Sequence, residues 1–189
     1  MSSQLDRWQG EFGRAYTDRN QVDWHTRVGA LKRIIPRDVS SVLEVGANRG
    51  HNLVALKSLG LDARGCEPAD YARAEAVNQG LLVCACSVYD LYDGGHTSDL
   101  VMTCGVLTHV PPARLDDALG RIVDVARRYV LAIEYDGNDE SIEYRGHQDM
   151  LWKRDYGKHY RRLFPELRVV QEGVLASEFD GAAYWLLQK

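Results

Sequence analysis

The segment 44–52 carries the residues whose types and spacing could bind a ligand through the backbone. Gly46 and Gly50 are placed where the chain must turn sharply and let a ligand come close. A dinucleotide-binding turn would need glycine at positions 46, 48 and 51, but this chain has Asn48 and His51 at the last two. No Gly-Lys-Ser/Thr comes after the turn, so the loop that cradles phosphates in nucleotide hydrolases is missing as well. The turn therefore fits neither phosphate-binding fingerprint.

The four cysteines form neither a CxxC pair nor the spacing of a secreted disulfide framework, which predicts reduced thiols at Cys66, Cys84, Cys86 and Cys104. Cys84 and Cys86 lie two positions apart in the apolar run 81–86, so they would face the same side of a strand. A metal-binding pair is conceivable there. We favour buried small hydrophobic residues, since cysteine without a disulfide is among the most buried residue types. No metal site is predicted.

The elements that must position the turn alternate between strand and helix. Apolar and β-branched runs predict strands at 41–45, 63–67, 81–86, 99–104 and 129–134. Helical patterns predict helices at 52–59, at 71–79 and from Pro112 onward. Strands and helices that alternate at this spacing are typical of parallel βαβ units. In such sheets, ligands bind beyond the carboxyl ends of the strands.

Both ends of the chain depart from this alternation. Two strand-like runs, 167–174 and 182–187, are separated only by a turn-rich segment and predict a closing antiparallel hairpin. Residues 1–38 are expected to form helices outside the sheet, as an extension of the domain 39–189. The predicted fold is therefore α/β, with a doubly wound, mainly parallel seven-stranded sheet, a C-terminal antiparallel hairpin and an N-terminal helical extension.

Length and charge exclude several classes of function. The 189 residues suit one compact unit, and 23 Lys+Arg against 27 Asp+Glu give a net charge of −4. Without long basic runs, the chain lacks the electrostatic footprint of a general nucleic-acid or membrane-surface binder. No apolar stretch approaches the roughly 20 residues of a membrane span, and the first residues lack an apolar signal region. We expect a cytoplasmic protein.

The turn and the segments after the next strands resemble class I S-adenosylmethionine-dependent methyltransferases. An acidic residue, Glu44, stands two positions before the first glycine, and a second glycine stands four positions after it. Glu67 stands 21 positions after Gly46 (67 − 46), where this family places the acid that binds both ribose hydroxyls. The segment 98–110 resembles the family's fourth motif and the loop that comes after that motif. The resemblance covers roughly residues 40–135, and Asn48 departs from it, since many members have glycine there.

The resemblance implies S-adenosylmethionine as the cofactor and assigns residues to it. The turn and the acid after the second strand would contribute Glu44, Gly46, Asn48, Gly50 and Glu67. The segment after the third strand, with Ser87 and Val88, would contact the adenine, and Asp90 there could equally be a turn residue. The extension 1–38 would fold over the cofactor as a lid, with Tyr16 and Arg19, or would only pack on the surface.

The acceptor side of the resemblance lies after the fourth and fifth strands. His109 would lie near the donor methyl group, where a neutral imidazole could take a proton from an acceptor, although a structural histidine is the alternative. The segment 134–160, rich in aromatic and cationic residues, is the expected acceptor site, with Tyr135, Arg145 and His147 as its contacts. Parts of the flanks look like the methylase subfamily associated with pseudaminic acid biosynthesis.

The sequence therefore predicts methyl transfer to oxygen or nitrogen of a small polar metabolite, with no nucleic acid or membrane as partner. Two alternatives stay open: a nucleoside-binding module without methyl transfer, and an NAD-dependent oxidoreductase. The oligomeric state and the acceptor cannot be predicted. Because cofactor and acceptor residues come after different strands, we expect them on opposite sides of the point where the strand order reverses.

Overall fold

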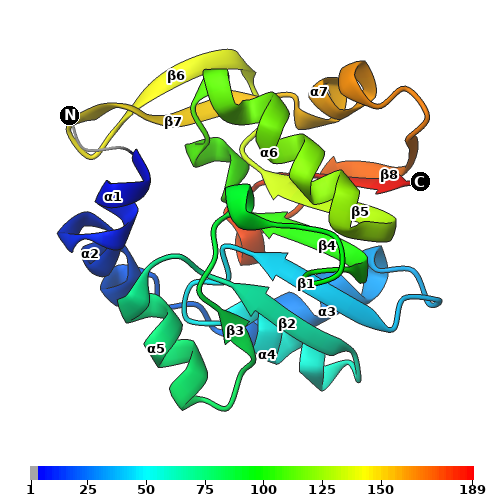
Figure 1. Ribbon diagram of the computed structural model, residues 1–189, viewed down its shortest axis with the longest axis horizontal. Coiled ribbons are helices and arrows are strands. Elements are labelled where there is room, and N and C mark those ends of the chain that lie inside the picture. Colours follow the sequence, from blue (N-terminus) through cyan, green and yellow to red (C-terminus); the bar gives the residue numbers. More distant parts are fainter. Residues whose placement is uncertain (1–3) are drawn as a thin grey trace. The chain divides into compact units, whose positions relative to one another are not determined.

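The computed structural model describes residues 4–189 and contains a seven-stranded sheet with flanking helices (Figure 1). The sheet strands are β1 (Ser41–Val45), β2 (Asp62–Cys66), β3 (Val83–Cys84), β4 (Ser98–Cys104), β5 (Ala126–Glu134), β8 (Arg168–Val174) and β9 (Ala183–Gln188). Their order is β3-β2-β1-β4-β5-β9-β8. The pairs β1–β2, β2–β3 and β4–β5 are parallel, whereas β9 is antiparallel to both β5 and β8. The predicted mainly parallel α/β sheet with a C-terminal antiparallel hairpin is confirmed.

The chain forms two compact units, one up to Asp90 and one from Leu91. The helices of the first unit are α1 (Gln4–Gln9), α2 (Glu11–Arg19), α3 (Trp24–Ile34), α4 (His51–Ser58) and α5 (Asp70–Asn78). Residues 4–38 thus contain the helices predicted for the extension 1–38, of which residues 1–3 lie outside the described part. Within residues 4–189, no helix is both long and apolar enough to cross a membrane.

The core of the first unit forms around β1, whose apolar and β-branched side chains are buried on both faces of the strand. Val42, Leu43 and Val45 are each at most 3% exposed. A parallel strand in the middle of a sheet is covered on both faces, which explains this continuous apolar run. In the register of β1 with β2, Val45 lies opposite Cys66, so the two strands end at the same level. The turn after β1 and the residues after β2 therefore emerge side by side.

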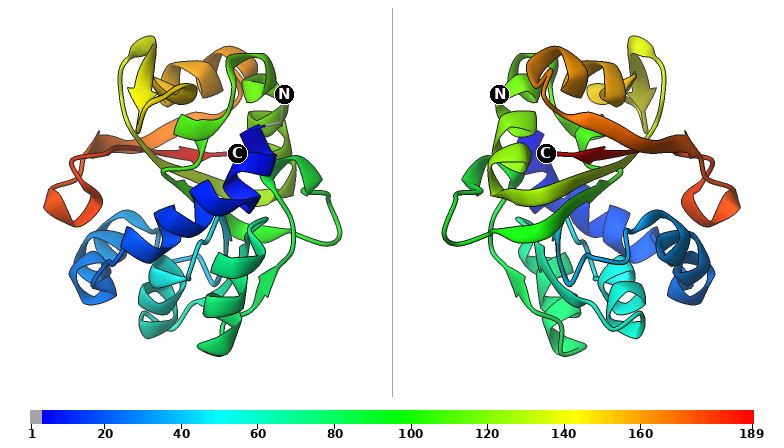
Figure 2. Two further views of the ribbon diagram at one scale, coloured as in Figure 1. Left: turned by 90° about the vertical axis from the view of Figure 1, so that its left-hand side faces the viewer. Right: turned by 90° about the vertical axis from the view of Figure 1, so that its right-hand side faces the viewer.

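The second unit contains a hairpin that is separate from the main sheet. Its helices are α6 (Pro112–Val125) and α7 (Tyr156–Leu163), and its hairpin strands are β6 (Asn138–Tyr144) and β7 (His147–Arg154). Pro112 begins α6, where its missing N–H is not needed for a helical hydrogen bond. β6 and β7 pair only with each other, and Figure 2 shows them standing apart from β8 and β9.

Two elements differ from the sequence prediction. The third strand spans only 83–84 rather than 81–86, because the buried Leu81 packs beneath Gly50 and the chain already turns at Cys86. The hairpin β6–β7 was not predicted at all. Its strand β6 is almost entirely exposed, so it lacks the apolar alternation that would indicate a half-buried strand.

Candidate functional site

The turn after β1 contains three backbone reversals in close succession. Gly46, Asn48 and Gly50 have φ angles of 70°, 49° and 85°, all in the left-handed region that favours glycine. The N–H groups of Gly46 and Ala47 donate to the carbonyl of Cys66 at 2.8 and 3.0 Å. These bonds fix the turn to the end of β2. The glycine pattern that stood out in the sequence is therefore a backbone requirement of this turn.

Asn48, the departure from the family pattern, has a local explanation. Asparagine is one of the few residues besides glycine that tolerate the left-handed region, because its side chain can bond to the nearby backbone. Here the Asn48 Oδ1 accepts from the N–H of Arg49 at 2.8 Å. The N–H of Asn48 itself donates to Oε2 of Glu67 at 2.8 Å. A glycine is thus replaced without loss of the turn, and the turn gains a bond to the acid after β2.

Glu67 is buried, and backbone N–H groups hold both of its carboxylate oxygens. Oε1 accepts from the N–H of Ala69 at 2.8 Å, and Oε2 accepts from the N–H of Asn48. Burial raises the pKa of Glu67, while the N–H groups of Ala69 and Asn48 act in the opposite direction. Each oxygen can accept a second hydrogen bond. The structure therefore brings the glycine-rich turn and Glu67 together, with acceptor capacity left on a fixed carboxylate.

Glu44 is fully buried behind the turn at the end of a chain of side chains. Its Oε1 accepts from Nδ2 of Asn52 at 2.6 Å, and the Asn52 Oδ1 accepts from Arg27 at 2.7 Å. Within the described residues, the Glu44 Oε2 is buried and accepts no hydrogen bond. Burial raises the pKa of this carboxyl to about 8. A buried oxygen of this kind fits a bound group that donates a hydrogen bond.

Substitution Glu44→Gln is expected to flatten the pH dependence of stability. Because the pKa of Glu44 is raised from 4.5 to about 8, the folded state holds a proton that the unfolded state releases between these values. The free energy of unfolding should therefore fall as pH rises through this window, by up to about 1.4 kcal/mol per pH unit. Urea denaturation of cofactor-free protein from about pH 5 to 8.5 measures it. Glu44→Gln should gain stability over the parent chain as pH rises, whereas Glu11→Gln, at an exposed acid, should track the parent.

Helix α2 is attached to the glycine-rich turn through Thr17, a residue that sequence reasoning missed. Thr17 is 1% exposed, and its Oγ1 accepts from Nδ2 of Asn48 at 3.4 Å. Its carbonyl accepts from the guanidinium of Arg49 at 3.4 Å, and Arg49 also forms an ion pair with Glu75 on α5. The N-terminal extension therefore contacts the turn directly.

Tyr16 and Arg19, the extension residues predicted for the cofactor, flank Thr17 on α2. Tyr16 is half-buried and packs edge-on against Trp8, with 5.2 Å between ring centroids. The guanidinium of the exposed Arg19 lies 5.3 Å from the centroid of the Tyr16 ring. The structure thus places both residues on the helix that reaches the turn, and their described ring contacts are within the extension.

Ser87 and Val88, predicted to contact an adenine, are buried at a short 3₁₀ turn after β3. The hydroxyl and the N–H of Ser87 both donate to Oδ2 of Asp90, at 2.6 and 2.8 Å. Asp90 is therefore a turn-forming residue, the alternative that the sequence left open. It presents this segment in a fixed conformation at the end of the first unit.

In the second unit, the buried carboxylate of Glu134 organises the loop after β4. Its Oε1 accepts from the N–H groups of Val106 and Leu107 at 3.1 Å each, and its Oε2 accepts from the N–H of Thr108 at 3.2 Å. Burial raises the pKa of Glu134 to about 7, and the donated hydrogen bonds oppose that rise. Glu134 ends β5, so the two parallel strands hold the loop between them. Sequence reasoning did not single it out.

Arg154, at the end of β7, holds the same loop from the hairpin side. This side chain is 2% exposed and donates to the carbonyls of Leu107 and Val110 at 3.2 and 2.9 Å. The Thr108 hydroxyl donates to the carbonyl of Trp152 at 2.7 Å. Buried cations need such acceptors to offset lost hydration. The base of the hairpin and the loop are thus one hydrogen-bonded assembly.

His109 lies on this loop with its ring orientation fixed. Its Nδ1 lies 2.6 Å from the carbonyl of Met150, which can only accept a hydrogen bond. Nδ1 therefore carries the proton and Nε2 is the basic nitrogen. Burial lowers the pKa of His109 to about 4, against the opposing hydrogen bond to Met150. The imidazole is neutral at pH 7, with the tautomer that a general base on this loop requires.

The hairpin brings one predicted acceptor residue near His109 and leaves another outside. The ring of Tyr144 lies 5.4 Å from that of His109, and the guanidinium of Arg145 lies 5.7 Å from the Tyr144 ring. Arg145 and Gly146 have φ angles of 54° and 78°, as in a two-residue type I′ hairpin turn. His147 is exposed opposite Tyr144.

Tyr135 lies at the start of the segment that leads into the hairpin. It is half-buried directly after β5, and its carbonyl accepts from the N–H of Arg154 at 3.2 Å. Burial raises the pKa of its hydroxyl. The second unit also contains a cavity of about 450 Å³. Its lining combines the hairpin base with α6 and α7: Pro112, Ala113, Leu115, Asp116, Asp139, Trp152, Arg154, His159 and Arg162.

Comparison with known proteins relates this geometry to a fold. No protein-family profile and no curated sequence matches the chain. Among solved structures, a Synechocystis magnesium protoporphyrin IX methyltransferase with bound SAM has a TM-score of 0.73 at 13% identity, covering 100% of this chain and 98% of that one. A Burkholderia thailandensis 1,6-didemethyltoxoflavin N1-methyltransferase with bound S-adenosylhomocysteine also gives 0.73, at 17% identity and coverages of 100% and 91%.

A third similar structure is a putative methyltransferase of Haloferax volcanii in complex with the activator Trm112. It gives a TM-score of 0.72 at 17% identity, covering 100% of this chain and 98% of that one. The chain has the Rossmann-like fold of these methyltransferases. At identities this low, the likeness extends to the fold and leaves the activity to be argued from the site.

Proposed function

We propose that this protein is an S-adenosylmethionine-dependent methyltransferase that acts on oxygen or nitrogen of a small polar metabolite. The observation that carries the proposal is the 2.8 Å hydrogen bond from the N–H of Asn48 to the carboxylate of Glu67. It joins the turn after β1 to the acid after β2 at the carboxyl ends of parallel strands, where α/β sheets bind nucleosides. The solved structures of this fold that contain SAM or S-adenosylhomocysteine support the same interpretation.

The first unit fits the cofactor. S-adenosylmethionine supplies an electrophilic methyl group on a sulfonium, and the chain supplies its binding site. Glu67 would accept from the ribose hydroxyls with the lone pairs that its backbone donors leave open. The buried Oε2 of Glu44 fits a donor group of the ligand or its solvent. The proposed cofactor-binding residues are Glu44, Gly46, Asn48, Gly50, Glu67, Ser87 and Val88, with Tyr16 and Arg19 on the lid formed by the extension 1–38.

The second unit supplies the acceptor side in this proposal. Nε2 of His109 would take the proton of the acceptor when the acceptor is not already a good nucleophile. Tyr135, Arg145 and His147 would bind the acceptor, together with the neighbouring Tyr144. Alignment of donor and acceptor is the main catalytic contribution expected of such a site.

The exposed guanidinium of Arg145 and the cations in the cavity lining favour an anionic acceptor. This agrees with the narrower resemblance to the methylase subfamily associated with pseudaminic acid biosynthesis. We therefore propose a small polar molecule with a carboxylate or phosphate as the first class of acceptor to be tested.

Two measurements test the proposal. Calorimetric titration should show binding of S-adenosylmethionine and S-adenosylhomocysteine, and incubation with pools of anionic metabolites or cell extract should yield S-adenosylhomocysteine. Binding without product in every pool would favour a non-catalytic nucleoside-binding module. Stabilisation by NAD in place of S-adenosylmethionine would favour an oxidoreductase.

Substitution Glu67→Ala is expected to weaken S-adenosylmethionine by roughly 1.5 to 3 kcal/mol, or about 10- to 150-fold in Kd, the usual worth of hydrogen bonds to a charged group. The loss includes the bond that Asn48 donates to this carboxylate. Glu67→Gln keeps one acceptor oxygen and should lose less. The exposed acid Asp70, at the start of α5, provides the control Asp70→Asn, which should bind as the parent does. Unchanged affinity in folded Glu67→Ala would contradict the ribose assignment.

A further inference from the structure

Three thiols meet at the carboxyl ends of β2 and β3. Cys66 is the last residue of β2, Cys84 is the last residue of β3, and the two are partners in the register of these strands. Cys86 lies two positions later, after a tight turn in which its N–H donates to the carbonyl of Cys84 at 3.1 Å. The turn brings Cys86 back to the same place as Cys84. All three residues belong to the first unit.

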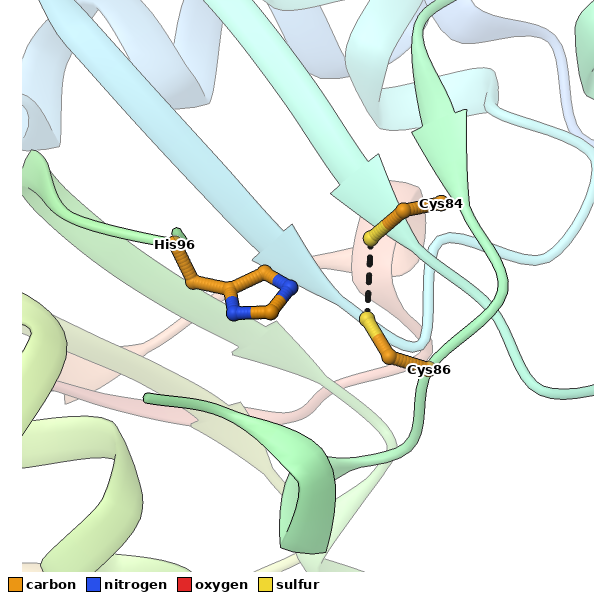
Figure 3. Close-up of side chains that lie close together, drawn as sticks. All are labelled: Cys84, Cys86 and His96. Atoms are coloured by element: carbon orange, nitrogen blue, oxygen red, sulfur yellow. Dashed lines mark hydrogen bonds between the residues drawn. The ribbon is translucent and has the colours of Figure 1, made fainter. Parts of the chain in front are cut away.

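The sulfur atoms of this group face one another. The Sγ atoms of Cys84 and Cys86 lie 2.9 Å apart, and Figure 3 shows the two side chains pointing toward each other. The thiol of Cys66 hydrogen-bonds to both neighbours, and these contacts raise its pKa well above the ordinary value, with burial adding to the rise. Simple apolar packing of three small side chains would not direct every sulfur to a common point.

Burial gives the group a closed side and an open side. Cys66 is 0% exposed and Cys86 is 8% exposed, whereas Cys84 is exposed. Three sulfur ligands that converge with one side open can hold an ion and leave a further coordination position. Thiolates are soft ligands and select soft or borderline cations such as Zn²⁺ and Cd²⁺ over Mg²⁺ or Ca²⁺.

We propose that Cys66, Cys84 and Cys86 form a binding site for a thiophilic metal ion. This replaces the sequence-based interpretation of the three residues as separate buried hydrophobic side chains. Each thiol would release its proton when the ion binds, so that three thiolates surround the cation and no oxidation or reduction takes place.

The position of the group indicates what a bound ion would stabilise. Glu67 comes directly after Cys66, and Ser87 comes directly after Cys86. An ion held by both strand ends would therefore tie together two segments that the proposed function assigns to the cofactor. Metal binding is nevertheless measured without cofactor, so a failure of this inference and a failure of the proposed function remain distinguishable.

The experiment titrates reduced, metal-free protein with Cd²⁺ in a chelator-free buffer and monitors the thiolate-to-cadmium charge-transfer absorption in the ultraviolet. The expected result is saturation at one ion per chain and a rise in thermal stability. Cys84→Ser and Cys86→Ser should each weaken binding by at least about tenfold, because each removes a soft ligand. Cys66→Ala tests the buried ligand, and the two other variants keep the test valid where that variant does not fold.

Cys104 provides the matched control, since it is a partly exposed thiol of the second unit. Cys104→Ser should bind one Cd²⁺ with the affinity of the parent chain. The proposal is overturned if the folded, reduced parent shows no charge-transfer band. It is also overturned if Cys84→Ser and Cys86→Ser bind Cd²⁺ as tightly as the parent, or if Cys104→Ser is the variant that loses the ion.

Discussion

Substitution Gly46→Val is expected to abolish binding of S-adenosylmethionine. Gly46 has a φ of 70°, where a β-branched residue is strained, and its N–H is fixed to the carbonyl of Cys66 at 2.8 Å. A side chain at this position would shift the turn that presents Asn48 to Glu67, or would occupy the space in which we place the cofactor. Calorimetric titration should show a loss of more than about 100-fold in affinity, some 2.7 kcal/mol.

The control for this prediction is Gly60→Val, which separates backbone strain from a role in binding. Gly60 has a φ of 83°, and a Cβ built there meets nothing within 4 Å. Both variants should lose stability through the same left-handed strain, but Gly60→Val should retain its affinity for S-adenosylmethionine. A folded Gly46→Val protein with the affinity of the parent chain would remove the glycine-rich turn from the proposed site.

Substitution His109→Ala is expected to lower kcat by roughly 10² to 10⁴, the usual contribution of a general base. The hydrogen bond from Nδ1 to the carbonyl of Met150 leaves Nε2 as the proton acceptor. Affinity for S-adenosylmethionine should stay within about twofold, since the proposed cofactor residues belong to the other unit. The measurement is steady-state formation of S-adenosylhomocysteine with the acceptor identified in the pools.

The pH profile distinguishes a base from a residue that only shapes the pocket. Because burial lowers the pKa of His109 to about 4, the parent enzyme should keep a constant kcat from about pH 8 down to about pH 5 and lose it below. The exposed His25, paired with Asp23, supplies the control His25→Ala, which should reproduce the parent profile. A fall of kcat centred near pH 6.5, or full activity in His109→Ala, would contradict the assignment.

The sheet could be predicted from sequence where strands are buried on both faces. The run 41–45 coincides with β1, and 99–104 falls one residue short of β4, because continuous apolar and β-branched residues mark such strands. Helix α6 begins at the predicted Pro112 and buries Leu115, Leu119 and Ile122. Strand β6 was missed since its pairing with β7 depends on backbone geometry and a left-handed turn more than on apolar alternation.

The candidate site was predictable where a backbone conformation leaves a mark on the sequence. Gly46 and Gly50 stand out because few residues accept their φ angles. Thr17, Glu134 and Arg154 leave no such mark. Their importance comes from partners far away in the chain: the N–H of Thr108 lies 26 positions from Glu134, and the carbonyl of Leu107 lies 47 positions from Arg154. No local pattern encodes pairings of this kind.

The hairpin β6–β7 divides into a part that can vary and a part that cannot. Its tip is the exposed turn at Arg145 and Gly146, where the guanidinium of Arg145 lies against the ring of Tyr144. Its base supplies the Met150 carbonyl to His109 and carries Arg154. A library randomised at the tip should therefore yield many folded members with an unchanged loop after β4, and a library randomised at the base should yield few. Directed evolution of acceptor preference would accordingly begin at the tip.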